Sequence, residues 1–344
     1  MSSLLEEGKC MIVAELSANH NHDLDIARES LRAIAETGAD AVKLQTYRPD
    51  SLTLDVRADD FQLKGGLWDG RWLYELYQEA CTPYEWHAEL YALARELGLV
   101  CFSTPFDSEG VDLLASLDNP IYKIASFEIM DIDLIRYAAR QGRPMVISTG
   151  IGSAREIEEA VEACRKEGND DITLLKCTSA YPARIEDGHL LLMRELREKY
   201  SVKVGLSDHS PGSMLPVLSV ALGGVMIEKH FILDRSLGGP DAAFSMDKEE
   251  FAEMVAKVRR AEAALAPGSG IPEDEDPGRG GRQWSRSLYI SEPVAAGEPF
   301  TRSNVACVRP GLSLHPRHLT ALLGRRASKD YNPGDRIPES ELGM

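Results

Sequence analysis

Short runs of apolar residues alternate with longer amphipathic stretches over roughly the first 265 residues of the chain. The runs are rich in Val, Ile and Leu and show little regular polar alternation, which is typical of strands buried on both faces of a parallel sheet. Eight such runs occur, and they predict strands at residues 10–15, 41–45, 100–103, 121–125, 145–148, 173–176, 202–205 and 225–228.

The stretches between these runs carry signals for the start of helices. Ser153 is followed three residues later by Glu156, and Thr82 by Glu85, which is the spacing of a capping box. Eight alternating strand–helix units favour an α/β fold, a closed (β/α)8 (TIM) barrel, over an open doubly wound sheet. We therefore expect a catalytic barrel domain over residues 1–266.

Two further segments depart from the strand–helix alternation. The connection 46–81 is long for a barrel and holds several aromatic residues, so we expect it to pack as a lid or small subdomain. Residues 267–283 contain five glycines and three prolines, the composition of a linker. Residues 284–344 then show two short β-like runs, at 287–290 and 305–308, which predict a compact β-rich module.

The charge balance limits the partners of this chain. It carries 55 acidic and 38 basic side chains, and a formal net charge of −17 argues against nucleic-acid or membrane partners. The six cysteines form no Cys-x-x-Cys pair, which is typical of a reducing compartment. No signal-peptide pattern and no apolar run of membrane-spanning length occur, so we expect a cytoplasmic protein.

Polar residues lie at or near the C-terminal end of every predicted strand. Active sites of (β/α)8 barrels are built from residues at these ends. Two lysines and four hydroxyl-bearing residues of this set have the chemistry to hold a phosphate and a carboxylate together. They are Lys43, Lys123, Thr104, Ser126, Ser148 and Ser207.

His209 and His230 end adjacent predicted strands, so both imidazoles can point into one cavity. Two histidines with open positions suit a divalent cation acting as a Lewis acid. Glu15 and Glu128 are candidates for acid–base roles. Purely structural roles stay open for two of these residues. His209, beside Asp208, is also compatible with a hydrogen-bonded histidine of the core, and Lys123 with a structural ion pair inside the barrel.

At these same residues the sequence resembles the sialic acid synthase family. The matching segments are 14–21 (AELSANHN), 42–47 (VKLQTY), 103–107 (STPFD), 123–128 (KIASFE), 205–210 (GLSDHS) and 228–231 (EKHF). The C-terminal module resembles the antifreeze-like (SAF) domain of that family. The resemblance covers essentially the whole chain.

The resemblance implies a reaction in which C3 of phosphoenolpyruvate adds to C1 of an open-chain amino-sugar aldehyde. Water then attacks C2, and phosphate leaves by C–O cleavage. It further implies a divalent metal, Mn²⁺ first and Co²⁺ or Mg²⁺ as alternatives, on His209 and His230. The six lysine and hydroxyl residues named above would hold phosphoenolpyruvate. Glu15 and Glu128 would be catalytic, with Glu128 as general base for the water.

The sugar would be bound by residues of two domains. The resemblance assigns it to Gln45, Tyr181, Asp241 and Arg309, where Arg309 matches an arginine that the SAF domain inserts into the partner subunit's active site. This implies a domain-swapped homodimer. Ser179 departs from the family pattern, which places an asparagine there, so its contact is not carried over.

The loop 17–23 resembles the pseudaminic acid branch of the family, which implies 2,4-diacetamido-2,4,6-trideoxy-L-altrose as the sugar. Other interpretations stay open at this point. The same chemistry on N-acetylmannosamine or on the legionaminic acid precursor is one. A Schiff-base aldolase using Lys123 or Lys176 is another, and a non-catalytic carbohydrate-binding protein is a third.

Overall fold

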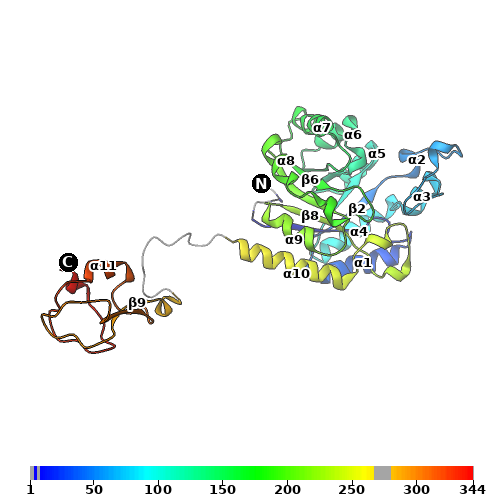
Figure 1. Cartoon of the computed structure of the whole chain (residues 1–344). Coiled ribbons are helices and arrows are strands. Elements are labelled where there is room, and N and C mark those ends of the chain that lie inside the picture. The colour runs from blue at the N-terminus through cyan, green and yellow to red at the C-terminus, as the bar shows by residue number, and fades with distance from the viewer. Residues whose placement is uncertain (1–3, 6–7, 267–279, 344) are drawn as a thin grey trace. The chain divides into compact units, whose positions relative to one another are not determined.

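The computed structural model describes residues 4–5, 8–266 and 280–343 (Figure 1). It divides the chain into two compact units, Met1–Ala266 and Pro267–Met344. Within the predicted linker, residues 267–279 lie outside the described residues. No helix among the residues that the structure describes is long and apolar enough to cross a membrane.

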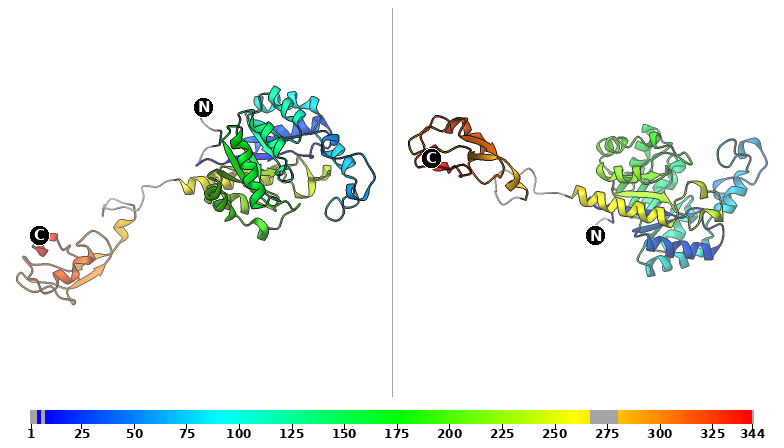
Figure 2. Two further views of the ribbon diagram at one scale, coloured as in Figure 1. Left: turned by 90° about the horizontal axis from the view of Figure 1, so that it is seen from above. Right: turned by 60° about the horizontal axis from the view of Figure 1, so that its bottom comes forward.

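The first unit is a closed parallel barrel in which each strand pairs with the next and β8 pairs with β1, so the predicted (β/α)8 fold is confirmed. The strands form an inner ring with the helices outside (Figure 2). They are β1 Met11–Glu15, β2 Ala41–Thr46, β3 Val100–Pro105, β4 Tyr122–Ile124, β5 Met145–Ser148, β6 Ile172–Cys177, β7 Lys203–Asp208 and β8 Met226–His230.

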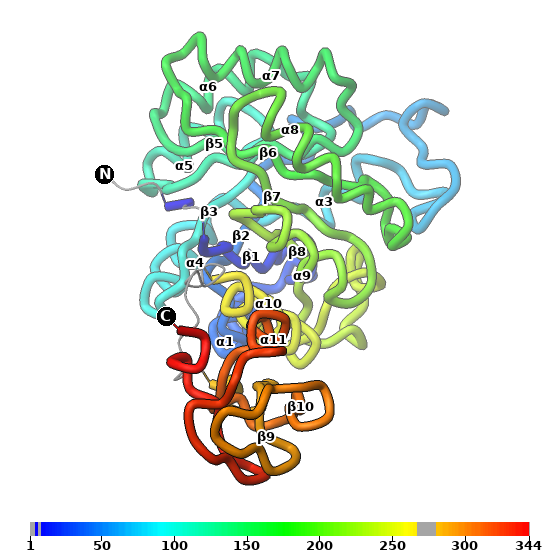
Figure 3. The backbone as a smooth tube through the Cα atoms, turned by 60° about the vertical axis from the view of Figure 1, so that its left-hand side comes forward, coloured from blue at the N-terminus to red at the C-terminus, as the bar shows by residue number. Residues whose placement is uncertain are grey.

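The helices of the outer ring follow the strands in order, and α5, α6 and α7 lie side by side (Figure 3). The ring consists of α1 Leu24–Glu36, α4 Tyr84–Glu96, α5 Ser108–Ser116, α6 Ile132–Ala139, α7 Ala154–Lys166, α8 Leu192–Tyr200, α9 Met214–Ala221 and α10 Lys248–Leu265. The capping box of Ser153 and Glu156 at α7 is present as predicted. The one predicted at Thr82 is wrong, because Pro83 is the N-cap of α4 and the Thr82 hydroxyl bonds His20 Nε2 at 3.0 Å instead.

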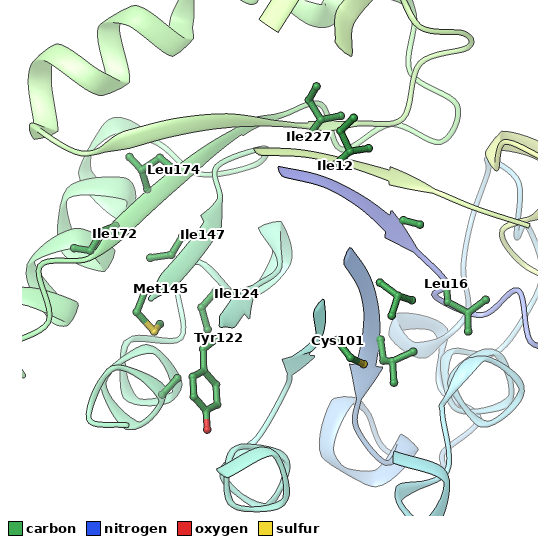
Figure 4. Close-up of a cluster of buried hydrophobic side chains, with 14 of the residues drawn as sticks. Ile12, Leu16, Cys101, Tyr122, Ile124, Met145, Ile147, Ile172, Leu174 and Ile227 are labelled. Atoms are coloured by element: carbon green, nitrogen blue, oxygen red, sulfur yellow. The ribbon is translucent and has the colours of Figure 1, made fainter. Parts of the chain in front are cut away.

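The main core lies between the strands and the surrounding helices, and Figure 4 shows part of it, with Ile124, Ile147 and Leu174 on neighbouring strands. A second core fills the lower part of the barrel interior. Gly205 lies in this crowded interior, where a Cβ would meet the Met226 carbonyl oxygen at 2.5 Å. Strand side chains alternate with a period of two, so residues two positions further along each strand form the next interior layer.

That next layer is polar. On β8, for example, Met226 belongs to the interior core, whereas Glu228 and then His230 line a cavity above it. On β2 the same step leads from Ala41 to Lys43. Apolar residues thus fill the barrel interior at the N-terminal ends of the strands, which we call its base, and polar residues line the cavity at the C-terminal ends.

The connection 46–81 folds onto the barrel, as predicted from its aromatic residues. It contains α2 Pro49–Leu52, α3 Leu73–Ala80 and a bridge between Gln62 and Trp72. The Trp68 indole N–H donates a hydrogen bond of 3.0 Å to the carbonyl oxygen of Pro240, which follows β8.

The second unit is a small β-rich module. Strands β9 Ser287–Ile290 and β10 Val305–Val308 pair antiparallel at the two predicted positions. A short helix, α11 Leu319–Leu322, packs on the same core. Its buried residues include Phe300 and Tyr331, so this unit has an apolar core of its own.

Candidate active site

Two lysines and two glutamates meet at the centre of the polar layer. Lys43 Nζ lies 2.6 Å from Glu15 Oε2 and 3.8 Å from Glu228 Oε1, and Lys123 Nζ lies 3.4 Å from the same oxygen of Glu228. All four side chains are at most 5% exposed. Opposite charges this close and this buried hold each other in a fixed arrangement.

The two glutamates of this cluster differ in their pKa values. Burial raises the pKa of Glu15 to about 7, against the attraction of Lys43. Burial also acts to raise the pKa of Glu228, but the ammonium groups of Lys123 and Lys43 outweigh it and hold that pKa below its usual range. Glu228 is therefore ionised near neutral pH while Glu15 is poised to exchange a proton.

Hydroxyl groups surround this cluster. Lys43 Nζ donates to Thr104 Oγ1 at 3.1 Å, and Ser207 Oγ donates to Glu228 Oε1 at 3.3 Å. Ser126 Oγ accepts from the Ile151 N–H and from Ser179 Oγ, both at 2.9 Å. The Ser148 hydroxyl is buried without a hydrogen-bond partner.

All six residues predicted to hold an anionic substrate line one cavity of about 60 Å³. They are Lys43, Thr104, Lys123, Ser126, Ser148 and Ser207. Two ammonium groups and four hydroxyls in so small a space suit a substrate with a phosphate and a carboxylate. Their role toward phosphoenolpyruvate stays a prediction.

The two predicted metal ligands lie next to each other at the mouth of this cavity. The rings of His209 and His230 are 5.3 Å apart between centroids. Burial lowers the pKa of both imidazoles, so both are neutral and can act as ligands. His209 Nδ1 lies 2.9 Å from the Thr178 carbonyl oxygen and donates a hydrogen bond to it. The lone pair of Nε2 is therefore available for a metal ion.

These residues fit a divalent cation with an open coordination sphere. His230 Nδ1 is buried without a hydrogen-bond partner and lies 3.7 Å from Asp241 Oδ2. No group of three or more His, Cys, Asp or Glu side chains arranged for a metal occurs in the part of the chain that the structure describes. Two imidazoles would therefore share the ion with oxygens of water or substrate, as in a catalytic site.

A larger cavity of about 380 Å³ adjoins the first. The two share Gln45, Tyr181 and His230, and the larger one is also lined by Glu128 and Asp241. All the sugar-binding residues predicted from the first unit thus lie together. Gln45 Nε2 donates to Ser17 Oγ at 2.8 Å and to Glu15 Oε1 at 3.3 Å, and the Tyr181 ring lies 4.4 Å from that of His209.

Glu128 ends a short 3-10 turn, Ser126–Glu128, directly after β4. Burial raises its pKa to about 7, and its Oε2 is buried without a hydrogen-bond partner. A carboxylate with a pKa near the working pH is suited to accept a proton. Its predicted role as general base is compatible with this geometry and stays a prediction.

Family models match both units of the chain. Residues 30–270 match the model of the NeuB family, and residues 285–342 match that of the SAF domain. The chain belongs to the NeuB family. Members of this family are phosphoenolpyruvate-dependent sugar-acid synthases, so the predicted enzyme class and the predicted C-terminal domain are both confirmed.

Three relatives place the chain within the NeuB family. It is 52% identical over 319 residues to the pseudaminic acid synthase of Helicobacter pylori, covering 92% of this chain and 93% of that one. It is 36% identical to the N,N'-diacetyllegionaminic acid synthase of Legionella pneumophila, covering 95% and 93%. The crystal structure of the Bacillus subtilis spore coat polysaccharide biosynthesis protein spsE is 33% identical with a TM-score of 0.64, covering 97% and 95%.

Glu228 is the residue of this NeuB-family site that the sequence analysis left without a role. It precedes His230 by two positions, so both side chains point to the same interior face of β8. This two-residue spacing from His230 was the sequence signal that could have placed Glu228 in the site. The structure shows Glu228 as the shared partner of Lys43, Lys123 and Ser207.

The remaining candidates lie elsewhere. Arg309 is exposed in the second unit, one residue after β10, and its contact with a sugar stays a prediction. His20 is fully buried and bonded to Thr82, which is a structural role. His87 of α4 is buried as well, and its Nε2 lies 2.8 Å from Thr46 Oγ1.

Proposed function

We propose that this chain is a pseudaminic acid synthase, which condenses phosphoenolpyruvate with 2,4-diacetamido-2,4,6-trideoxy-L-altrose and releases phosphate. The observation that carries the proposal is 52% identity to a pseudaminic acid synthase over more than nine tenths of both chains. The legionaminic acid synthase relative is only 36% identical over a similar length, which disfavours the alternative sugars.

The proposed reaction forms one carbon–carbon bond and breaks one carbon–oxygen bond. C3 of phosphoenolpyruvate forms a bond to C1 of the aldehyde, whose oxygen takes up a proton and becomes a hydroxyl, and water adds to C2 with loss of a proton. The C2–O bond to phosphate then breaks and the phosphate leaves. Lys43 and Lys123 offset the charge of the phosphate and carboxylate, and the nearby hydroxyls fix their orientation.

Glu128 would accept the proton of the attacking water, because it lines the larger cavity, which adjoins the anion-binding one, and has an unpartnered oxygen. His209 and His230 would hold a divalent cation, with Mn²⁺ ahead of Co²⁺ and Mg²⁺. When bound, that ion supplies Lewis-acid polarisation of the aldehyde oxygen.

The Schiff-base alternative finds little support. Lys123 is held by the ionised Glu228. The Lys176 ammonium donates at 2.5 Å to Thr178 Oγ1 and at 3.2 Å to the Asp187 carbonyl oxygen, and its side chain lines neither of the two cavities. A lysine nucleophile needs a free neutral amine facing the carbonyl carbon of its substrate.

A homodimer is part of the proposal. Large apolar side chains are exposed between the end of β4, β5, β6 or β7 and the first turn of the next helix, at the end of the barrel that holds the site. They include Phe127, Met130, Ile151, Ile185, Leu191 and Met214. Phe127 is 55% exposed and lines the larger cavity, so this apolar rim borders the site. Burial of such a rim against a second copy of the chain is favourable.

The predicted cytoplasmic location belongs to the same proposal.

Replacing Arg309 with alanine tests the swapped arrangement. We expect KM for the sugar to rise by about tenfold or more with KM for phosphoenolpyruvate nearly unchanged, because a charged hydrogen bond to the sugar is lost. Steady-state kinetics with each substrate varied in turn measure both constants. Arg302, also exposed in the second unit, provides the control Arg302→Ala. An unchanged sugar KM in Arg309→Ala counts against domain swapping.

The proposed activity is tested by phosphate release from phosphoenolpyruvate in the presence of Mn²⁺. The diacetamido-trideoxy-altrose, the legionaminic acid precursor and N-acetylmannosamine are offered separately. We expect release with the first sugar. Release only with another sugar moves the specificity and keeps the chemistry, whereas no release with any of them contradicts the proposed function.

A further inference from the structure

The larger cavity has two unlike walls. The barrel side supplies polar groups, among them Gln45, Glu128 and Asp241, next to the rings of Phe106, Phe127 and Phe244. The connection 46–81 supplies a mostly apolar side, which also includes Tyr47 and Ala80. Six of its residues form what we call the apolar wall: Leu52, Leu63, Trp68, Leu73, Leu76 and Tyr77. Only the tyrosine hydroxyl and the indole N–H of this wall can form a conventional hydrogen bond, and the indole N–H is already used by Pro240.

Trp68 fastens this wall over the cavity. Its hydrogen bond to the Pro240 carbonyl joins parts of the chain 172 residues apart. Its ring lies 5.8 Å from the Tyr181 ring, which in turn contacts His209. Pro240 directly precedes Asp241, so the Trp68 edge of the wall is tied to the loop that carries Asp241.

The wall still has apolar surface to bury. Leu63, Trp68 and Leu73 are only half-buried although each lines the cavity. Covering such surface with another apolar group is favourable, whereas placing an unpaired hydroxyl against it is costly. The wall therefore favours a ligand that brings methyl groups to this side.

We propose that the apolar wall sets the sugar specificity by receiving the methyl groups at the far end of the sugar. This inference rests on the proposed function. With C1 of the aldehyde beside His209 and His230, an extended sugar chain directs its opposite end away from the polar layer and toward the wall. The 6-deoxy carbon and the acetamido group on C4 are the methyl-bearing groups of that end.

The expected selectivity is moderate. A hydrophobic pocket rejects a ligand that merely adds a hydroxyl by roughly 10²-fold in kcat/KM, and one methylene contributes roughly 10–200-fold. The wall distinguishes sugars by their methyl groups and not by the configuration of their stereocentres. Two sugars with the same substituents and different configuration are therefore separated by the polar side of the cavity.

The test compares kcat/KM for the trideoxy sugar and for its analogue with a hydroxyl on C6. In the double variant Leu63→Asn/Leu73→Asn, which adds amides to the wall, we expect the preference for the trideoxy sugar to fall by about tenfold or more. KM for phosphoenolpyruvate should stay the same. The matched control is Leu54→Asn/Leu67→Asn, because both leucines belong to the same connection, are exposed at 61% and 46%, and do not line this cavity.

If thermal unfolding shows that the asparagine variant does not fold, the double variant Leu63→Ala/Leu73→Ala is measured in its place. It removes apolar surface without adding a polar group, and the preference should again fall. A preference equal to that of the control in the folded variants overturns the inference while the enzyme remains a pseudaminic acid synthase. Absence of turnover of the trideoxy sugar by the unaltered protein overturns the proposed function itself.

Discussion

Replacing His209 or His230 with alanine is expected to abolish metal-dependent turnover while leaving the barrel folded. Each imidazole is neutral because burial lowers its pKa, and His209 is oriented by its bond to the Thr178 carbonyl. With a single imidazole left, the site would have too few protein ligands to retain a divalent ion. Activity should fall to background at any Mn²⁺ concentration that saturates the unaltered protein.

Metal binding itself supplies a readout that does not depend on activity. Mn²⁺ that binds only the folded protein raises its melting temperature, in proportion to ln(1 + [Mn²⁺]/Kd). We expect this rise in the unaltered protein and its loss in both alanine variants. His189→Asn is the control, since His189 is exposed and has a left-handed backbone that asparagine tolerates. Full activity in either alanine variant contradicts the metal assignment.

The barrel was predictable because its base is apolar. The first two residues of every strand include at least one member of the interior core or the surrounding core, and these apolar residues produced the eight runs. The predicted ends were less accurate where the strand continues into the site. The run at 202–205 predicted too short a strand, because β7 extends through Ser207 to Asp208. Likewise β8 extends to His230.

These errors have one physical cause. Inside this barrel, polar residues belong to the strands, and many of them form hydrogen bonds or ion pairs with one another. An apolar sequence pattern therefore ends where the polar layer of the site begins, although the strand continues. Asp208 and Lys229 show the same effect on the opposite face of the strands. Their charges pair at 2.7 Å with side chains at most 2% exposed, which a sequence pattern reads as surface.

The candidate site could be assembled from the sequence only by residue type and strand end. That procedure brought the six anion-binding candidates and both histidines to one place, because parallel strands carry their C-terminal ends to the same rim. It could not predict the partnership of Glu228 with two lysines. Nor could it find the wall formed by Leu63 and Leu73, because this depends on how the connection 46–81 folds back over the barrel.

Glu128→Gln is expected to lower kcat by roughly 10²–10⁴-fold, the range for loss of a general base. Glutamine keeps the size of the side chain and removes its ability to take a proton. Phosphate release under saturating substrates gives kcat directly. Glu158→Gln is the matched control, because Glu158 is exposed on α7 and lines neither cavity. A kcat equal to that of the unaltered protein removes Glu128 from the mechanism.

The pH profile separates Glu128 from the second glutamate with a raised pKa. A general base works in its ionised form, so kcat of the unaltered enzyme should fall as the pH drops below about 7, where Glu128 becomes protonated. Burial raises the pKa of Glu15 to about 7 as well, so this acidic limb alone does not identify the base. If Glu128 is the base, the limb should flatten in the residual activity of Glu128→Gln. If the variant retains the full limb, the titrating group is Glu15, whose proton Lys43 would then control through their 2.6 Å contact.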